Sequence, residues 1–253
     1  YFNASTHPVV YMDAGLHGEE KPITRALLNF MTKVCESADE DDSFGWLRRN
    51  VKFIIIPVVC PYGYVNSLRY NANHVNINRN FDTAVWSNGT DDPTSNDYRG
   101  ASPASEKETQ YVQSIVDELS SQLTTAFYFN WHTHGVFTAY KQMTSFAIPS
   151  YKQDEMQKIG IEVIKELTAS GWKNHDLPIN SGFIGIIEFH TENSSAAVYG
   201  SEHSIPSATP EGMYKYYDGT YSVDYSTKLN CMNTEFILKS VMTALKRLVY
   251  MGH

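Results

Sequence analysis

Apolar and polar positions alternate along this chain with two different periods, and these periods predict strands and helices in turn. Short runs rich in β-branched and aromatic residues predict five strands, at residues 8–14, 51–58, 125–131, 182–188 and 205–209. Amphipathic stretches between them predict helices at residues 21–37, 105–122, 153–170 and 232–250. Strands and helices that alternate in this way predict the α/β fold class.

The ends of these elements and the segments between them predict a single domain over residues 1–253. The run Ser105-Glu106-Lys107-Glu108 fits a capping box, which predicts that Ser105 accepts hydrogen bonds from the first turn of the helix at residues 105–122. Residues 83–98 are polar and rich in Asn, Asp and Gly, and they predict a long surface loop. No internal repeat and no low-complexity linker divides the chain.

Composition and net charge limit the classes of partner that this chain is expected to bind. The chain has 253 residues, of which 42% are apolar, and this is enough to bury one sizeable core. A formal net charge of −8 argues against nucleic acid as a partner, and no apolar run is long enough to suggest a membrane partner. The three widely spaced cysteines, Cys35, Cys60 and Cys231, are interpreted as buried thiols rather than as a disulfide framework or a metal site.

The sharpest local motif follows the first predicted strand directly. His17 and Glu20 form an H-x-x-E pair, and this spacing lets an imidazole and a carboxylate reach one point from a tight turn. Zinc takes such nitrogen and oxygen ligands. A third ligand is offered at the end of another predicted strand by His132 or His134, which are two residues apart and would share a face of an extended segment.

Four motifs in order resemble the zinc metallocarboxypeptidases of the carboxypeptidase A type. They are His17-x-x-Glu20, then Arg69-Tyr-Asn-Ala-Asn-His-Val-Asn-Ile-Asn78-Arg79-Asn80-Phe81 after Pro61-Tyr62-Gly63, then Trp131-His132, and last Gly200-Ser-Glu-His-Ser-Ile-Pro-Ser-Ala-Thr-Pro-Glu211-Gly. The resemblance implies a carboxypeptidase-like fold, in which helices flank a central mixed, mostly parallel sheet. It also implies hydrolysis of the C-terminal bond of a peptide substrate that has a free carboxylate.

The resemblance further implies a role for each matching residue. One Zn²⁺ ion would be held by His17, Glu20 and His132, so the alignment prefers His132 to His134. Glu211 would be the general base that later protonates the leaving amine, and Arg69 would stabilise the oxyanion. Arg79, with Asn78 beside it, would grip the terminal carboxylate, which suits a guanidinium fork. Ala196 would belong to the specificity pocket.

Three positions depart from the family pattern around the metal. Asn76 stands where an aspartate usually fixes the first zinc histidine, Glu19 replaces a common arginine, and His190 lies where a mobile tyrosine is expected. Asn76 can still accept a hydrogen bond but carries no charge, which predicts weaker zinc binding or a less basic His17. His190 is a candidate to donate the missing hydrogen bond to the substrate.

Two alternative functions and one setting are considered beside the carboxypeptidase. The first alternative is a related zinc deacylase of N-acyl amino acids, and the second is a degenerate, non-catalytic module that binds peptide or cell-wall stem-peptide C-termini. Only sixteen residues precede His17, and the sequence opens without methionine. We therefore expect a module of a larger polypeptide, in an extracellular, cell-wall or phage-associated setting.

Overall fold

Parallel strands form the centre of the fold in this computed structural model, which describes residues 7–38, 42–122, 126–134, 153–169, 194–213, 216–217, 221–222 and 227–248. The strands lie in the order β2-β1-β3-β4, and β5 also pairs with β3. Their bounds are β1 Val9–Ala14, β2 Lys52–Ile56, β3 Ala126–His134, β4 Ser207–Ala208 and β5 Glu211–Met213. Every pairing among these five strands is parallel.

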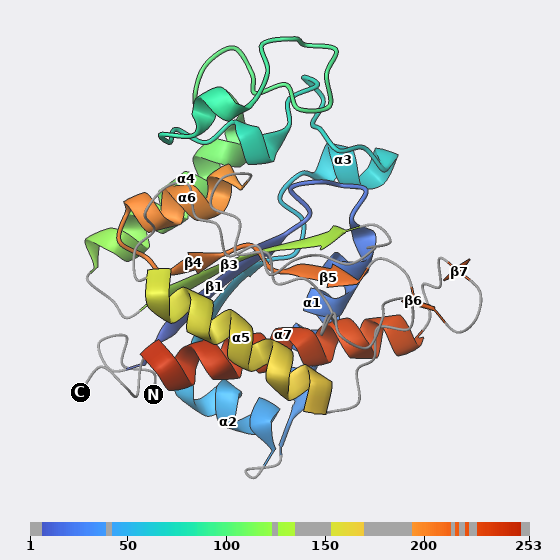
Figure 1. The fold of residues 1–253 in the computed structure, drawn as a ribbon, viewed down its shortest axis with the longest axis vertical. Helices are drawn as coiled ribbons and strands as arrows, with labels where there is room; N and C mark the ends of the chain where they lie inside the picture. Colours follow the sequence, from blue (N-terminus) through green and yellow to red (C-terminus); the bar gives the residue numbers. More distant parts are fainter. Residues whose placement is uncertain are drawn as a thin grey trace.

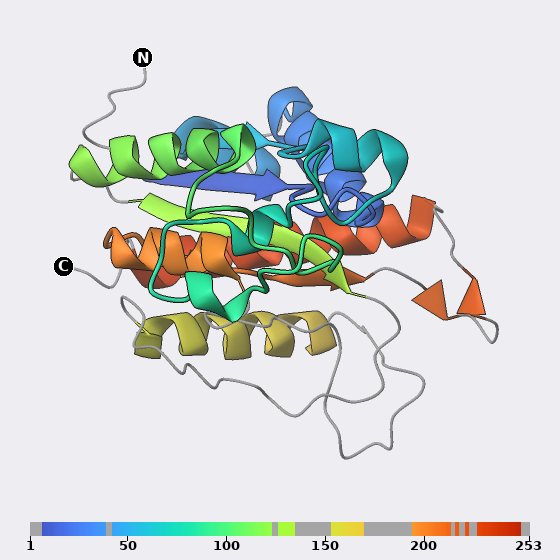
Figure 2. The same cartoon turned by 90° about the horizontal axis from the view of Figure 1, so that it is seen from above.

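Helices cover both faces of the sheet, as Figures 1 and 2 show. One face carries α1 (Lys21–Glu36), α2 (Ser43–Asn50), α5 (Gln153–Ala169) and α7 (Thr227–Leu248), and the other carries α4 (Lys107–Ser121) and α6 (Ser195–Glu202). The remaining described elements are α3 (Pro61–Asn66), η1 (Ile77–Arg79), η2 (Trp86–Asn88) and the antiparallel pair β6 (Tyr216–Tyr217) and β7 (Tyr221–Ser222). These elements and the loops between them flank the layered centre.

The pleat of the two central strands divides the core into two clusters. Val10 and Met12 of β1 pack with Phe129 of β3 in the cluster beneath α1 and α7. Their neighbours Tyr11 and Tyr128 point to the opposite face and join the cluster beneath α4 and α6. All five side chains are at least 99% buried, so both faces of β1 and β3 are inside the protein. The candidate site is built on the face of the sheet that α4 and α6 cover.

Most predicted elements are confirmed, and the misses are short. The strands at 8–14, 51–58 and 125–131 correspond to β1, β2 and β3, and the four predicted helices correspond to α1, α4, α5 and α7. The strand predicted at 205–209 shortens to β4, with β5 following it, and the one at 182–188 lies outside the described residues. Helices α2, α3 and α6 were not predicted, because six to eight residues give too few turns for a helical period to stand out.

The predicted capping box is wrong. Helix α4 begins at Lys107, two residues later than expected, and its N-cap residue Glu106 makes no capping hydrogen bond. Ser105 donates its hydroxyl proton to Glu106 Oε1 at 2.7 Å and accepts a hydrogen bond from Asn80 Nδ2 at 2.9 Å. The Ser105 side chain therefore connects the start of α4 to the loop around Asn80 and does not bond the amides of the first helical turn.

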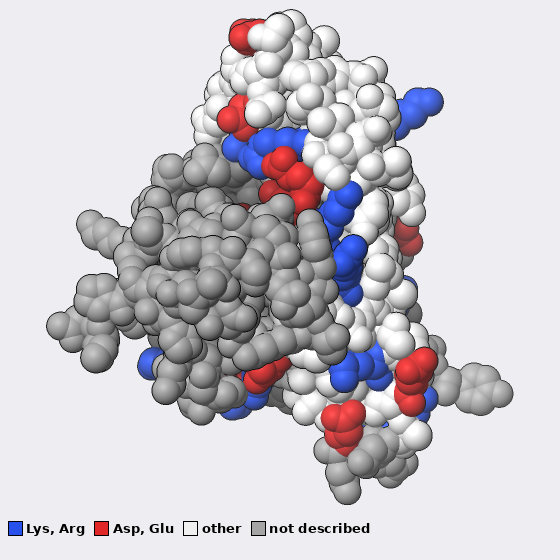
Figure 3. Space-filling model, turned by 90° about the vertical axis from the view of Figure 1, so that its right-hand side faces the viewer, with Lys and Arg blue, Asp and Glu red and all other residues white. Residues whose placement is uncertain are grey.

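The cysteines, the charged side chains and the hydropathy of the helices complete the comparison with the sequence. Cys60 is buried as predicted, whereas Cys35 and Cys231 are exposed, and all three thiols are free. Among the described residues seen in Figure 3, both basic and acidic side chains lie among uncharged ones. Within the described residues, no helix is both long enough and apolar enough to cross a membrane.

Candidate metal centre and substrate site

The segment that carries His17 and Glu20 makes a tight connection between β1 and α1. Gly18 lies so close to α3 that an added Cβ atom would collide with the backbone of Gly63, and its amide donates to the carbonyl oxygen of Leu68 at 2.9 Å. Glu20 is the residue directly before α1, and its amide donates to the carbonyl oxygen of His17 at 3.2 Å. A glycine inside the H-x-x-E motif is therefore a steric requirement of this loop.

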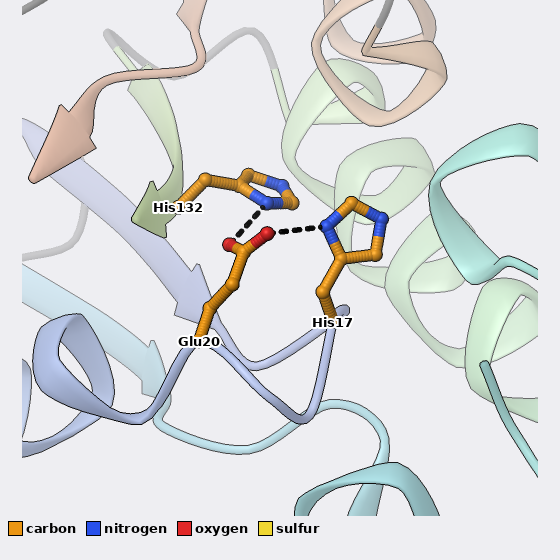
Figure 4. A group of neighbouring side chains, drawn as sticks. All are labelled: His17, Glu20 and His132. Atoms are coloured by element: carbon orange, nitrogen blue, oxygen red, sulfur yellow. Dashed lines mark hydrogen bonds and ion pairs between the residues drawn. The ribbon is translucent and has the colours of Figure 1, made fainter. Parts of the chain in front are cut away.

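Glu20 lies between two imidazole rings, as Figure 4 shows. Its Oε1 is 2.8 Å from Nδ1 of His17, and its Oε2 is 2.8 Å from Nδ1 of His132, which projects from β3. One ligand atom from each of the three residues can be chosen so that all lie within 4.8 Å of one another, and all three side chains are buried. The backbone amide of Thr133 donates to Glu20 Oε2 at 2.9 Å and fixes the carboxylate.

The hydrogen bonds of Asn76 decide which nitrogen of His17 carries the proton. The amide nitrogen of Asn76 lies 3.1 Å from the carbonyl oxygen of Asn96 and 3.2 Å from Asp97 Oδ1, and both of these atoms can only accept. Asn76 Oδ1 therefore faces His17 Nε2, 3.0 Å away, which must donate. The lone pair of His17 is then on Nδ1 and faces Glu20. Asn76 thus accepts a hydrogen bond from His17, as the sequence predicted.

The same logic applies to His132 on the other side of Glu20. Asn130 donates from Nδ2 to Asp13 Oδ1 at 2.6 Å, so its Oδ1 faces His132 Nε2 at 2.8 Å. Asn130 can therefore accept a hydrogen bond from His132 Nε2, and Nδ1 is the ring nitrogen that faces Glu20. Outer hydrogen bonds that hold ligand imidazoles in one tautomer are typical of protein metal sites.

Two imidazole nitrogens and one carboxylate therefore converge on a single buried point, and this arrangement fits a cation. Burial, and next the Arg69 guanidinium, lower the pKa of His17 to about 4, so this imidazole is neutral at pH 7, as a ligand must be. Burial raises the pKa of Glu20, but His132 and His17 together lower it by more. The net pKa lies well below its ordinary value, so the carboxylate stays ionised. Two imidazoles and one carboxylate are a ligand set that zinc takes at catalytic sites.

The comparisons with known proteins agree with this geometry. The family model described as zinc carboxypeptidase matches residues 2–244, which is nearly the whole chain. The chain belongs to the zinc carboxypeptidase family. It is 29% identical to carboxypeptidase B of Helicoverpa zea over 157 residues, covering 55% of this chain and 35% of that protein. It is 26% identical to carboxypeptidase A2 of Mus musculus over 183 residues, covering 66% of this chain and 43% of that protein.

Solved structures show the same family fold. Carboxypeptidase A from Helicoverpa armigera superposes with a TM-score of 0.75 at 21% identity, covering 99% of this chain and 63% of that chain. Thrombin-activatable fibrinolysis inhibitor superposes with a TM-score of 0.71 at 18% identity, covering 96% of this chain and 63% of that chain. The fold prediction is confirmed. The matches span less than half the length of the two carboxypeptidases compared by sequence.

Two arginines lie beside the candidate metal centre of this zinc carboxypeptidase family member. Arg69 Nη1 is 3.2 Å from His17 Nδ1 and 3.7 Å from Glu20 Oε1, so its charge lies beside two of the three candidate ligands. Arg79 is largely buried, donates from Nη1 to the carbonyl oxygen of Asn78 at 3.1 Å, and pairs with Asp97 at 3.4 Å. Asp97 is also 3.9 Å from Arg69, so one half-exposed carboxylate joins the two guanidinium groups.

Asn78 connects three elements of the site. Its Oδ1 accepts from the backbone amide of Ala196 at 3.1 Å and lies 3.2 Å from the hydroxyl of Ser194, so its Nδ2 faces His132 Nε2 at 3.3 Å. Ala196 itself is fully buried in the cluster beneath α4 and α6. The structure therefore joins Asn78 to α6 and to a candidate ligand, and Ala196 contacts it through the backbone. The assignment of Ala196 to a specificity pocket stays a prediction.

Glu211 lies on β5, which pairs with the strand that carries His132. The pairing of β5 with β3 makes Glu211 the register partner of His132, and paired residues of neighbouring strands point to the same face of a sheet. His190, the candidate to replace the family tyrosine, lies outside the described residues. The backbone of His134 continues β3 past His132, which is the histidine that faces Glu20.

Three polar residues of the site escaped sequence analysis: Asp13, Asn130 and Asp97. Asp13 and Asn130 each lie between apolar or aromatic neighbours in a strand, which is a detectable signal, because a polar residue inside a strand buried on both faces needs a partner. Asp97 offered no such signal, since it lies in a polar loop where a charge is ordinary.

Proposed function

We propose that this protein is a zinc-dependent metallocarboxypeptidase that hydrolyses the C-terminal peptide bond of a peptide. The observation that carries the proposal is the buried convergence of His17, Glu20 and His132 beside Arg69. A zinc ion bound by these three residues would polarise the scissile carbonyl and lower the pKa of a bound water toward neutrality. Family membership implies peptide substrates in general, and the reaction at a chain end is our inference from the arginines.

The chain's own residues supply the proton transfer and the charge stabilisation. Glu211, beside His132 in the sheet, takes the proton of the attacking water and returns it to the leaving amine. Arg69 faces the same point and stabilises negative charge on the carbonyl oxygen in the transition state. Because Arg69 is already fixed near Glu20, little reorganisation is needed when that charge develops.

Arg79 and Asn78 restrict the reaction to the end of the peptide. Burial lowers the pKa of Arg79, and Asp97 opposes that change, so the guanidinium remains charged. A largely buried arginine next to an amide side chain suits a planar carboxylate, which only the C-terminal residue carries on its backbone. The Asp97 carboxylate already pairs with Arg79, so the substrate carboxylate shares this arginine with it.

The first experiment measures bound metal and turnover on the same purified sample. We expect one zinc ion per chain and release of free C-terminal amino acids from short peptides. A matched peptide whose C-terminus is amidated should be a poor substrate, because it offers Arg79 no carboxylate. Equal hydrolysis of the free acid and the amide would contradict the role of Arg79.

Two pairs of variants test the assigned roles. Glu211→Gln should lower kcat by roughly 10²–10⁴-fold with zinc still bound, whereas Glu118→Gln on the exposed side of α4 is the control for loss of a carboxylate. Arg79→Met should weaken substrate binding on the order of 10- to 100-fold, the effect of one charged hydrogen-bonding group, with Arg48→Met on α2 as its control. Full activity of Glu211→Gln would show that another group is the base.

The same measurements separate the two alternative functions. Release of acyl groups from N-acyl amino acids, with little activity on peptides, would identify a zinc deacylase. Stoichiometric zinc and tight binding of peptide C-termini without turnover would identify a non-catalytic module. Absence of metal from protein purified without chelators would contradict both the peptidase and the deacylase.

A further inference from the structure

Glu19, inside the H-x-x-E motif, places a solvent-exposed carboxylate beside Arg69. Its Oε1 lies 3.8 Å from Arg69 Nη1, and 45% of its side chain is exposed, against 27% for the arginine. The loop that carries it is fixed, because the amide of Gly18 donates to the carbonyl oxygen of Leu68, directly before Arg69 in the chain. A negative charge is therefore held at the open edge of the candidate site.

The nearest lysine in the sequence does not neutralise Glu19. Lys21 turns toward α3, where its Nζ donates to the hydroxyl of Ser67 at 2.6 Å and lies 5.3 Å from the centre of the Tyr64 ring. Among the described residues, the printed cation contact of Glu19 is the one with Arg69.

The Arg69 guanidinium separates two groups of charges. Its Nη2 lies 3.9 Å from Asp97, which also pairs with Arg79 at 3.4 Å. Its Nη1 lies near Glu19 at 3.8 Å and near the candidate ligand Glu20 at 3.7 Å. The contacts therefore run in the order Arg79, Asp97, Arg69, Glu19, with Arg79 and Glu19 on opposite sides of one guanidinium.

This order fixes which part of a peptide comes close to Glu19. In the proposed reaction the terminal carboxylate binds Arg79, and the carbonyl oxygen of the scissile bond faces Arg69. The chain of the substrate that continues beyond that carbonyl then leads away from Arg79 and toward Glu19. Because one extended residue spans only about 3.3–3.6 Å, the first residue on that side is the penultimate one, which carries the scissile carbonyl.

Substrate binding also removes part of the ion pair that Glu19 makes. The terminal carboxylate competes with Asp97 for Arg79, and the charge that develops on the carbonyl oxygen competes with Glu19 for Arg69. Glu19 then keeps its negative charge next to a partner that another anion shares. A cation on the substrate restores the balance, and a second anion there is repelled.

We propose that Glu19 is a specificity-determining residue that binds a cationic group, an ammonium or a guanidinium, on the penultimate residue of the peptide. The cation is either the side chain of that residue or, in a dipeptide, its free α-amino group. Glu19 stands where the family pattern commonly has an arginine, so this charge preference belongs to the present chain. The inference rests on the proposed function and names the substrate class that the same site favours.

The experiment compares kcat/KM of zinc-loaded protein for dipeptides that share one C-terminal residue. In N-acetylated peptides the penultimate residue is Lys, norleucine or Glu, so that the charge changes while the apolar stem of Lys is matched by norleucine. We expect the Lys peptide to exceed norleucine by about 3- to 5-fold, the effect of one partly exposed charge pair, and the Glu peptide to fall below it. The preference should shrink as salt is added.

A norleucine dipeptide with a free α-amino group separates the two sources of the cation. If the side chain is recognised, the acetylated Lys peptide gains and the unblocked norleucine peptide does not. If the α-ammonium is recognised, the unblocked norleucine peptide gains over its acetylated form. Either gain supports a cation site at Glu19, and the absence of both overturns it.

Variants show whether the preference comes from Glu19. Glu19→Gln should bring the Lys and norleucine peptides to the same kcat/KM, and Glu19→Lys should move the preference to the Glu peptide. Glu36→Gln, at the exposed end of α1, is the matched control and should keep the wild-type order. If Glu19 only held Arg69 in place, Glu19→Gln would lower kcat/KM equally for the whole panel.

Failure of this inference is distinct from failure of the proposed function. Equal cleavage of all peptides by wild type, or a Lys preference that survives in Glu19→Gln, overturns the role of Glu19 and leaves the carboxypeptidase in place. If no peptide is cleaved, the proposed function fails, and calorimetric binding of the same panel decides for Glu19. Tighter binding of the cationic peptide that is lost in Glu19→Gln supports the site, and equal binding overturns it.

Discussion

The carboxyl group of Asp13 gives protein stability a pH dependence whose sign follows from its surroundings. Burial raises its pKa from 3.8 to about 6, although hydrogen bonds from Asn130, Tyr128 and Tyr11 act in the opposite direction. The unfolded chain exposes this group and returns it to its ordinary pKa. Between about pH 4 and pH 6 the folded protein therefore holds a proton that the unfolded chain has lost, and the free energy of unfolding falls as the pH rises through this window.

The size of the effect follows from the same two values. A pKa raised from 3.8 to about 6 corresponds to about 3 kcal/mol of unfolding free energy, at roughly 1.4 kcal/mol for each pKa unit. The contribution of Asp13 to stability is most favourable below about pH 4 and has been lost above about pH 6. An asparagine side chain has no such proton to release, so the free energy of unfolding of Asp13→Asn lacks this pH-dependent contribution.

Urea unfolding of wild type and Asp13→Asn at a series of pH values between about 4 and 7 measures the effect. Both proteins are kept metal-free with a chelator, so that metal binding does not add its own pH dependence. The quantity compared is the free energy of unfolding of wild type minus that of the variant, which should fall by about 3 kcal/mol across the series. Asp82→Asn, at an exposed position, is the control for removing a carboxylate.

Two results would refute the reasoning in different ways. A difference that stays constant with pH would mean that the three hydrogen bonds offset burial completely. A difference that grows as the pH rises would mean that the hydrogen bonds outweigh burial, so that the folded protein favours the ionised form. In either case, the pKa of Asp13 would not be raised by its surroundings.

Three further predictions concern the loop, the metal and the core. Gly18→Ala should destabilise the protein by roughly 1–3 kcal/mol and weaken zinc binding, because the added methyl group meets the backbone of Gly63; unchanged zinc affinity in a titration would contradict this. Adding zinc to metal-free protein at about 100 times its Kd should stabilise the fold by about 2.7 kcal/mol, seen as a higher Tm, and an unchanged Tm would argue against a folded-state site. Phe129→Ala should cost about 3–5 kcal/mol in urea unfolding, and a loss under 1 kcal/mol would show that the core beneath α1 and α7 collapses around the gap.

The sequence predicts the central elements well because each has a strong local signal. Strands β1 and β3 are apolar or aromatic at nearly every position, and α1 and α7 repeat their apolar residues with the helical period. The H-x-x-E and Asn-Arg motifs are equally local and could be found by pattern. The pairing of Asp13 with Asn130 is not local, because it depends on the register of two strands more than a hundred residues apart. No period in the sequence reports a register.

Asn76 stands where the family pattern has an aspartate, and a negative charge is still present one residue further away, on Asp97. Asn76 Oδ1 accepts a hydrogen bond from His17 Nε2, as the sequence predicted, and Asn76 Nδ2 donates to Asp97. Asp97 is half exposed and is shared with Arg69 and Arg79, so water and two guanidinium groups screen most of its charge from the imidazole. His17 should therefore remain a weaker base than a histidine that donates directly to a carboxylate. Asn76→Asp should then bind zinc more tightly than wild type, and equal affinity would show that Asp97 already supplies the full effect through the amide.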